Sequence, residues 1–307
     1  MLKHRLLLGP VFIAAFIGLL WLDEWLDRQP CPTGLGWLCS DGTGTLPPAL
    51  VLFLIGLVLV SIAARELGRI FHAGGVAASR RWMSIAAIAG LAVSAALPAE
   101  LSSARSVALV ASCGALVLIG SLLWHIRDRE LHGATAAAGA SMFAFVYLGL
   151  MFGFMLAIRR EHSAWLLLSI VAITKSCDTA AYFTGKSIGR HKLILWISPG
   201  KTWEGLAGGV IGAALVAVLC SWLLRTYGDP SGPLAGTTWW LAAAFGGLLA
   251  LAGQAGDLLA SVLKRDAGIK DSGRIPGFGG ILDMIDSLLV VAPIAYWLIG
   301  SISGMKA

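Results

Sequence analysis

Residues 47–64 read PPALVLFLIGLVLVSIAA, a run of 18 residues without an ionisable side chain. A helix needs roughly 20 such residues to cross the hydrocarbon core of a bilayer. Outward from this stretch, comparable apolar runs recur along the whole chain, centred on residues 6–22, 82–98, 106–124, 134–158, 163–184, 205–224, 238–263 and 280–303. The pattern predicts an all-α, polytopic integral membrane protein with about nine transmembrane helices.

The amino-acid composition excludes an ordinary soluble protein. Of the 307 residues, 57% are hydrophobic and only 13% are charged, whereas soluble domains carry about 25% charged residues. Many of the 38 glycines lie inside apolar runs, as Gly208-Gly209 and Gly246-Gly247 do. Because small residues let membrane helices approach closely, the glycine content indicates helix packing and not disorder.

The distribution of Lys and Arg predicts the orientation of the chain. With the N-terminus inside, the predicted inner segments contain 16 of the 23 Lys and Arg residues, the outer segments contain six, and Lys175 lies within a span. Cytoplasmic loops of membrane proteins carry an excess of Lys and Arg. We therefore expect the N-terminus inside and the C-terminus outside.

The formal net charge of +6 follows from the same topology. A nucleic-acid-binding surface would need these cations on one face of a folded soluble domain, and the sequence offers no such domain. We therefore expect no nucleic-acid partner.

Two cysteines, Cys31 and Cys39, share the first predicted outer loop. An oxidising compartment would allow them to form a disulfide. Two free thiols are the alternative, because their spacing permits a bond without requiring one.

The two halves of the chain differ in where their ionisable residues lie. Residues 1–160 keep them mainly in loops, which predicts a transmembrane scaffold. Residues 161–307 place charged side chains inside or at the mouth of apolar helices, at Lys175, Asp178, Asp257, Asp283 and Asp286. Because a charge within a bilayer costs at least about 2.5–3.5 kcal/mol, we predict a catalytic transmembrane region there. For any one of these residues, an ion pair that locks two helices together is the alternative.

Helical spacing brings the acidic side chains together. Asp257, Ser261 and Lys264 are separated by four and three residues, so they share one face of a helix. Asp283 and Asp286 also share a face, where they would share a proton or bind a cation. Three hard oxygen ligands, Asp257, Asp283 and Asp286, predict a Mg²⁺ site with places left for water or phosphate. The proton-relay or sodium site of a transporter is the alternative.

Two polar loops adjoin these helices and indicate a polyphosphate ligand. Residues 276–280 read PGFGG directly before the last helix, where backbone N–H groups and the helix dipole favour an anion. The flanking cations are Lys264, Arg265, Lys270 and Arg274. Residues 198–202 read SPGKT and expose Ser198 and Lys201 as weaker candidates. A simple turn into a helix, and cations that only set the topology, are the alternatives.

Residues 261–286 read SVLKRDAGIKDSGRIPGFGGILDMID, which closely resembles the signature of CDP-diacylglycerol synthases, also called phosphatidate cytidylyltransferases. That signature runs S-x-x-K-R, four residues, K-D-x-G, then P-G-H-G-G-x-x-D-R-x-D. Upstream, KSCDTAAYFTGKSIGRHKL at 175–193 and SPGKTWEG at 198–205 resemble the family's D-x-x-A-Y-x-x-G and S-P-x-K-T-x-E-G stretches. The resemblance covers roughly residues 175–290.

The resemblance implies a multi-pass enzyme of a bacterial-type inner (plasma) membrane, commonly a homodimer, with its active site facing the cytoplasm. Such an enzyme condenses CTP with the membrane lipid phosphatidate and yields CDP-diacylglycerol and pyrophosphate. Asp257, Asp283 and Asp286 would hold Mg²⁺. A second cation would be K⁺, which the resemblance leaves open. Lys264 and Arg265 join these acids as catalytic residues. The substrate-binding positions that the resemblance implies are Ser261, Lys270, Asp271, Ser198, Lys201 and Asp178.

The sequence departs from the family signature at three points. Phe278 replaces the histidine, Met284 replaces the arginine between the last two acids, and the loop between Gly273 and Pro276 is one residue shorter. A phosphate monoester needs positioning more than a base, so we expect activity to survive. A related CTP-using lipid kinase or an altered lipid substrate is the alternative. A cation-coupled transporter is disfavoured, because its helix breaks would recur in both halves.

Overall fold

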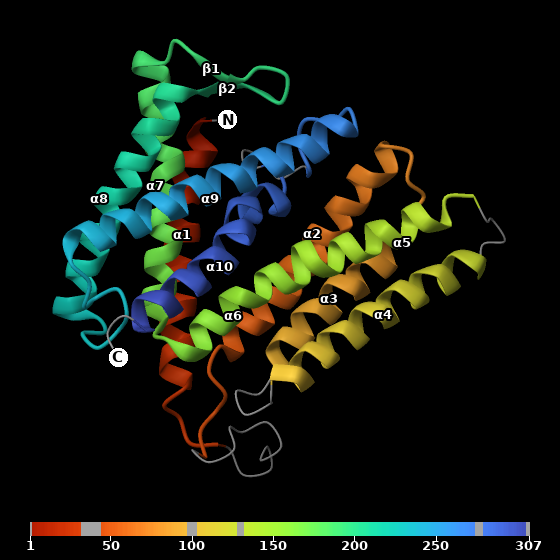
Figure 1. Ribbon diagram of the computed structural model, residues 1–307, viewed down its shortest axis with the longest axis horizontal. Coiled ribbons are helices and arrows are strands. Elements are labelled where there is room, and N and C mark those ends of the chain that lie inside the picture. Colours follow the sequence, from red (N-terminus) through yellow and green to blue (C-terminus); the bar gives the residue numbers. More distant parts are fainter. Residues whose placement is uncertain (1, 32–43, 97–102, 128–131, 274–278, 305–307) are drawn as a thin grey trace.

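The computed structural model describes residues 2–31, 44–96, 103–127, 132–273 and 279–304, and these residues are mostly helical (Figure 1). The helices are α1 (Leu2–Leu26), α2 (Leu50–Ala73), α3 (Arg80–Ala96), α4 (Ser103–Arg127), α5 (Ala134–Phe143), the π-helix η2 (Ala144–Leu150), α6 (Met151–Glu161), α7 (Ala164–Ile188), α8 (Trp203–Tyr227), α9 (Trp239–Asp266) and α10 (Ile281–Gly304). A short antiparallel hairpin, β1 (Lys192–Ile194) and β2 (Ser198–Thr202), connects α7 to α8.

Seven helices in the described part of the chain are long and apolar enough to cross a membrane. They are α2, α4, the continuous helix Ala134–Glu161 made by α5, η2 and α6, and then α7, α8, α9 and α10. The prediction of a polytopic, all-α membrane protein is confirmed. Helices α1 and α3 coincide with two further predicted spans but are outside this set.

The helices pack side by side in an order that places α10 at the centre (Figure 1). Helix α8 packs on α7 and α9, α9 packs on α10, and α10 contacts α2 and α6. On the far side, η2 packs on α3 through two glycines: a Cβ on Gly90 or on Gly149 would lie 2.5 Å from a backbone oxygen of the other helix. Helix α10 therefore joins the N-terminal and C-terminal halves of the chain.

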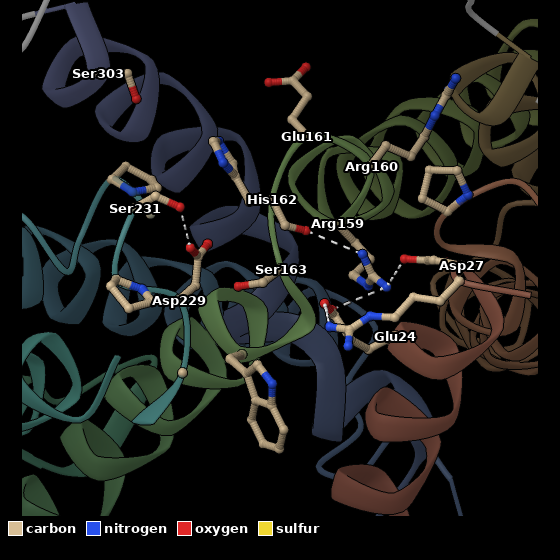
Figure 2. Close-up of a pocket in the computed structure, with 17 residues that line it drawn as sticks. Glu24, Asp27, Arg159, Arg160, Glu161, His162, Ser163, Asp229, Ser231 and Ser303 are labelled. Carbon is tan, nitrogen blue, oxygen red and sulfur yellow. Dashed lines mark hydrogen bonds and ion pairs between the residues drawn. The ribbon is translucent and has the colours of Figure 1, made fainter. Parts of the chain in front are cut away.

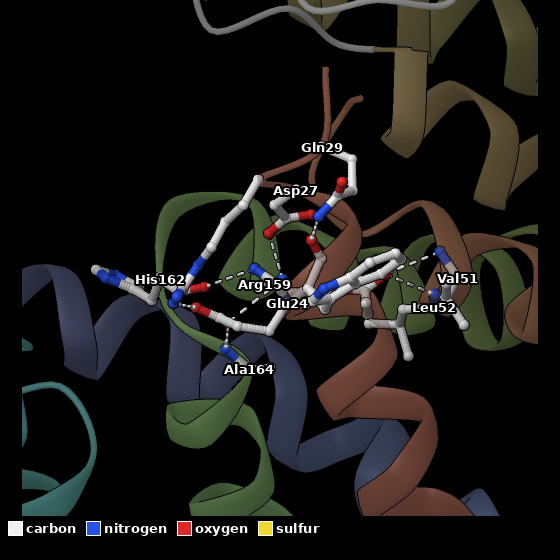
Figure 3. Close-up of polar contacts among 11 residues, drawn as sticks. Glu24, Asp27, Gln29, Val51, Leu52, Arg159, His162 and Ala164 are labelled. Carbon is white, nitrogen blue, oxygen red and sulfur yellow. Dashed lines mark hydrogen bonds and ion pairs between the residues drawn. The ribbon is translucent and has the colours of Figure 1, made fainter. Parts of the chain in front are cut away.

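A buried ionic cluster closes one end of the bundle, and we call its four residues, Asp23, Glu24, Asp27 and Arg159, the Arg159 cluster (Figure 3). The Arg159 guanidinium at the end of α6 lies 2.7 Å from Asp23 and 3.4 Å from Glu24, and it also pairs with Asp27. Arg159 and Asp23 are 3% and 1% exposed. Asp23 and Glu24 also accept hydrogen bonds from N–H groups that begin α2 and α7, at 2.8 and 2.7 Å. The end of α1 therefore fixes three other helices.

The described cysteines are of two kinds, one disulfide-bonded and three free. Cys31, which follows α1, is disulfide-bonded, so it is not one of a pair of free thiols. Cys39, the partner that the sequence offers, lies outside the described residues. Cys113, Cys177 and Cys220 are free.

Replacing Arg159 by methionine leaves three carboxylates together without their cation. Breaking a buried ion pair in this way typically costs about 3–5 kcal/mol, so we expect a clear fall in the thermal unfolding temperature of the protein in detergent. Arg28→Met is the control, because Arg28 pairs with Glu24 at 3.5 Å while its side chain is 75% exposed. The control should change stability by at most about 1 kcal/mol. Equal unfolding temperatures for Arg159→Met and the unaltered chain would contradict this role.

Candidate active site

The predicted site forms where the last third of α9 crosses the beginning of α10. A glycine permits the contact: a Cβ on Gly256 would lie 2.7 Å from the backbone oxygen of Asp286. Asp257, the next residue on α9, therefore lies within electrostatic range of Asp286 on α10. Asp286 is 2% exposed, and its Oδ1 accepts hydrogen bonds from the Ser287 N–H and hydroxyl at 2.6 and 3.1 Å. The structure thus brings two of the three predicted metal ligands together.

The hairpin between α7 and α8 contributes a cation to this acidic pair. Lys201 on β2 places its Nζ 2.6 Å from Asp257 Oδ2. At the end of α9, Arg265 Nε donates a hydrogen bond to the carbonyl oxygen of Ile197, 3.3 Å away, in the turn between the strands. The loop therefore reaches the acidic pair through Lys201, whereas Ser198 is half-buried at the edge of the hairpin.

Asp283 is held in a separate set of contacts at the first turn of α10. Its Oδ1 lies 2.7 Å from Lys264 Nζ. Its Oδ2 accepts hydrogen bonds from the Ser272 N–H and hydroxyl at 3.1 and 2.8 Å, and from the Gly280 N–H at 3.0 Å. A carboxylate three residues into a helix that accepts from the preceding backbone is one half of a capping box. Asp283 therefore fixes both the helix start and the loop beside it.

A carboxylate from the N-terminal half, Glu66 of α2, completes this cap. Glu66 is 5% exposed, and its oxygens accept hydrogen bonds from the N–H groups of Ile281 and Leu282 at 3.2 and 2.9 Å. It also accepts from the Ser272 hydroxyl at 3.2 Å. Sequence reasoning missed Glu66, because a single acid at the end of an apolar helix carries no sign of its distant partner.

These contacts correct the predicted anion site at the start of α10. The N–H groups of Gly280, Ile281 and Leu282 are hydrogen-bonded to the carboxylates of Asp283 and Glu66, so protein anions fill the place expected for a phosphate group. The N-terminus of α10 does attract negative charge, as the helix dipole predicts. The charge is supplied by the chain itself. Arg274 and Phe278, from the same loop, lie outside the described residues.

A third acid, Asp178 of α7, lies beside the Asp257–Asp286 pair. Its Oδ1 accepts a hydrogen bond from Gln254 Nε2 at 3.2 Å, and its Oδ2 is 3.6 Å from Lys175 Nζ. Asp178 interacts electrostatically with Asp257 and Lys201. The site therefore extends from Lys264 at the end of α9, through the acidic pair, to Lys175 deeper in α7.

The remaining predicted residues surround this core less closely. Ser261 is half-buried on the same face of α9 as Asp257 and Lys264, as its spacing predicts, whereas Lys270 and Asp271 are exposed in the following loop. Met284, which replaces the family arginine, packs against the hydrophobic core. The structure does not give Lys270 or Asp271 a contact with the acidic pair.

The donor set of the acidic pair suits a small hard cation. Mg²⁺ is commonly bound by one or two carboxylates and completes its shell with water and substrate phosphates. Asp257 and Asp286 provide such a pair, and Asp257 is open to solvent, with 35% of its side chain exposed. Within the described residues, no three His, Cys, Asp or Glu side chains converge as a metal-holding group. The predicted third ligand, Asp283, is engaged by Lys264 and Ser272.

A shallow groove opens beside Lys175 on the surface of α7 and α8. Its volume is about 430 Å³, and it is lined by Lys175, Ser176, Thr179, Ala180, Gly212 and Val216. A lysine within a membrane-spanning helix is costly unless a counter-charge meets it. Asp178 is that counter-charge, with its Oδ2 3.6 Å from Lys175 Nζ.

A larger cavity of about 760 Å³ lies at the opposite end of α7, α8, α9 and α10, next to the Arg159 cluster (Figure 2). Its charged lining consists of four carboxylates and three arginines, namely Glu24, Asp27, Glu161, Asp229, Arg28, Arg159 and Arg160. Because the four carboxylates outnumber the three arginines, this cavity has no surplus of positive charge for a polyphosphate. The acids and lysines predicted from the sequence lie instead where the end of α9 meets the start of α10, which we call the α9–α10 end.

Comparison with known proteins shows the family of the chain. The profile of the cytidylyltransferase family matches residues 42–302. The chain is 40% identical to the uncharacterised protein YnbB of Escherichia coli over 154 residues, which is 45% of this chain and 48% of YnbB. It is 38% identical to the phosphatidate cytidylyltransferase of Bacillus subtilis over 163 residues (52% of this chain, 57% of the relative). The matched regions of these two curated relatives span about half of their lengths.

Replacing Glu66 by alanine removes both acceptors of the first N–H groups of α10. Loss of a helix cap typically costs about 1 kcal/mol, so we expect faster hydrogen–deuterium exchange at Ile281 and Leu282. Glu24→Ala is a matched control, since Glu24 accepts from the Ala164 N–H at the start of α7. The control should accelerate exchange at Ala164 and leave α10 unchanged. Unaltered exchange at Ile281 and Leu282 in Glu66→Ala would show that Glu66 is not the cap.

Proposed function

The chain belongs to the cytidylyltransferase family, and on this premise we propose that it transfers the cytidylyl group of CTP to phosphatidate. A phosphate oxygen of phosphatidate attacks the α-phosphorus of CTP, the bond from that phosphorus to the β-phosphate bridging oxygen breaks, and CDP-diacylglycerol and pyrophosphate form. The observation that carries the proposal is the acidic pair Asp257–Asp286, in which Asp257 contacts Lys201. Lys264 lies nearby and pairs with Asp283. Acids that hold a cation and lysines that hold phosphates are what this transfer requires.

The cations of the site bind the triphosphate by exchanging partners. Lys201 and Lys264 each contact a single carboxylate, at 2.6 and 2.7 Å, and a triphosphate offers each of them a more highly charged acceptor. Arg265, at the end of α9, binds from the same side. Lys270, Asp271, Ser261 and Ser198 border the nucleotide from the two loops, and Asp178 orients Lys175.

Asp257 and Asp286 would hold Mg²⁺, with Asp283 as the third ligand once Lys264 leaves its Oδ1 for a phosphate. When bound, the ion offsets the charge that develops as pyrophosphate leaves. Asp286 is positioned for this role by the two hydrogen bonds from Ser287, and Asp257 by the close contact of α9 with α10 at Gly256. A second cation such as K⁺, and a homodimer, stay predictions.

Phosphatidate reaches the site from the lipid through the groove between α7 and α8. The lining of this groove includes one cation, Lys175, and the hydroxyl groups of Ser176 and Thr179, which suit a phosphate. Exposed apolar side chains of α8, among them Ile211 and Leu215, adjoin the groove residues Gly212 and Val216 in sequence and would contact the acyl chains. CTP arrives from the other side, where Pro199 and Gly200 of the hairpin are exposed.

We further propose nine membrane crossings in a bacterial-type inner membrane, with residues 1–160 as the scaffold, residues 161–307 as the catalytic region and the active site facing the cytoplasm. The end of α7, the start of α8, the end of α9 and the start of α10 lie near the acidic pair. The opposite ends of these helices lie near the cavity next to the Arg159 cluster. This alternation along the chain supports the arrangement. Helix α3 also connects the two ends: Arg80 packs against Gly68 of α2, and the Ala95 oxygen accepts from Arg160 at 3.0 Å. The excess of Lys and Arg in the α9–α10 end and its loops favours the cytoplasm.

The purified chain, given CTP, Mg²⁺ and phosphatidate in mixed micelles, should release pyrophosphate and form a CDP-lipid in equal amounts. Mass spectrometry of the lipid product and a pyrophosphate assay measure both. Absence of the CDP-lipid with several phosphatidates would contradict the proposed function, and a phosphorylated lipid with CDP would indicate a kinase.

Asp286→Asn is the matched negative control for that assay, because it keeps the size of the side chain and removes its charge. Changing a group that supports a bound metal typically costs about 10–100-fold in affinity or activity, so we expect turnover to fall at least that far. Asp229→Asn, at the opposite cavity, should leave turnover unchanged. Full activity of Asp286→Asn would remove the assignment of Asp286.

The orientation is tested with single cysteines placed at the two ends. Ser231→Cys lies in the loop between α8 and α9, and Lys192→Cys lies in the hairpin; both positions are exposed. In intact cells, a membrane-impermeant maleimide should label Ser231→Cys at once and Lys192→Cys only after permeabilisation, with the unaltered chain as background. The reverse order of labelling would overturn the proposed orientation.

A further inference from the structure

Tyr147 carries a buried hydroxyl group that nothing in the described chain satisfies. The residue lies in η2 and is 4% exposed, and its hydroxyl oxygen is buried without a hydrogen-bond partner among the described residues. Tyrosine hydroxyls in protein interiors usually find a partner, because leaving a polar group desolvated and unpaired is unfavourable. A residue needed only for packing would be served as well by phenylalanine.

The backbone at Tyr147 is also unusual. A π-helical segment, Ala144–Leu150, interrupts the otherwise α-helical span Ala134–Glu161. Segments of this kind are rare and often occur at functional sites, since the widened turn changes the direction of the side chains that it carries. The close contact between Gly149 and Gly90 of α3 fixes the segment in place. The orientation of Tyr147 is therefore built into the helix packing.

The surroundings of Tyr147 connect it to the acidic pair. On one side its ring packs against Phe143, with centroids 5.1 Å apart. Electrostatically it interacts with Asp286 and Asp257, although no hydrogen bond joins it to either carboxylate in the described structure. A neutral donor thus lies near two acids without binding them.

We propose that the Tyr147 hydroxyl donates a hydrogen bond to a phosphate oxygen of a substrate bound at Asp257 and Asp286. The inference rests on the proposed function and adds a substrate-binding residue from the N-terminal half. Phosphate oxygens accept hydrogen bonds, and a neutral phenol donates one without adding a charge to the site. The phosphate belongs to either CTP or phosphatidate, and the kinetics distinguish them.

Tyr147→Phe tests the inference, because it removes the hydroxyl and nothing else. A hydrogen bond to a charged group is typically worth about 10- to 100-fold in affinity or rate, so kcat/KM should fall by that factor. Thermal stability should stay equal or rise, because an unpaired buried group is removed. A rise in KM for CTP alone identifies the nucleotide phosphate as the acceptor, and a rise for phosphatidate alone identifies the lipid phosphate.

Tyr296→Phe is the matched control. The Tyr296 hydroxyl donates to Glu161 at 3.0 Å, near the opposite cavity, so its loss should leave kcat and both KM values unchanged. Unchanged kinetics of Tyr147→Phe would overturn the inference. A loss of activity that accompanies a lower unfolding temperature would also overturn it, because that result assigns Tyr147 a structural role.

The unaltered chain distinguishes failure of the proposed function from failure of this inference. If that chain forms no CDP-lipid, the proposed function fails, and equilibrium binding of CTP with Mg²⁺ and of dioleoylphosphatidate, measured by native mass spectrometry, tests the hydrogen bond without turnover. Weaker binding of one ligand by Tyr147→Phe supports the inference. Equal binding of both ligands by the two proteins would overturn it.

Discussion

The ion pairs Lys201–Asp257 and Lys264–Asp283 compensate charges inside the helix bundle, and the rest of the structure depends on this compensation. Lipid cannot solvate a charge, so each charged group within the helix bundle must be compensated by the protein. At the α9–α10 end these pairs fix the hairpin, the end of α9 and the start of α10. At the other end, the Arg159 cluster fixes α1, α6 and the starts of α2 and α7. Apolar helix packing fills the space between the two ends.

Under the same constraint, both halves of the chain contribute residues to the candidate active site. Helix α10 contacts α2 and α6 as well as α9, and its first turn depends on Glu66 of α2. Two hydrogen-bond acceptors for α10 thus come from the region that the sequence predicts to be a scaffold. Substitutions there are therefore expected to change the geometry of Asp283 and Lys264 as well as overall stability.

Local sequence patterns were sufficient for the helices and for part of the site. Apolar runs located the long helices, and the spacing of Asp257, Ser261 and Lys264 placed them on one face, because helical periodicity acts over a few residues. The partners of these residues were not predictable. The Ser272 hydroxyl meets Glu66 across 206 positions of sequence, and Arg159 meets Asp27 across 132. Such pairs follow from how the helices pack. The π-helix at Tyr147 has no sequence signal of its own.

The predicted phosphate site at the start of α10 shows how a correct physical rule can lead to the wrong ligand. The rule states that a helix N-terminus attracts an anion, and two carboxylates of the chain, Glu66 and Asp283, satisfy it. The proposed function therefore assigns phosphate binding to the lysines Lys201 and Lys264, each of which pairs with a single carboxylate. This division of roles follows from contacts between distant segments, which the loop sequence alone could not indicate.

The most direct test of the account is a crystal structure of the chain grown with CTP and Mn²⁺, in which anomalous scattering locates the ion. We predict an anomalous peak between the carboxylates of Asp257 and Asp286, with the triphosphate beside Lys201 and Lys264. A peak in the cavity next to the Arg159 cluster, or a triphosphate that contacts neither lysine, would contradict the central claim that the α9–α10 end is the site of cytidylyl transfer.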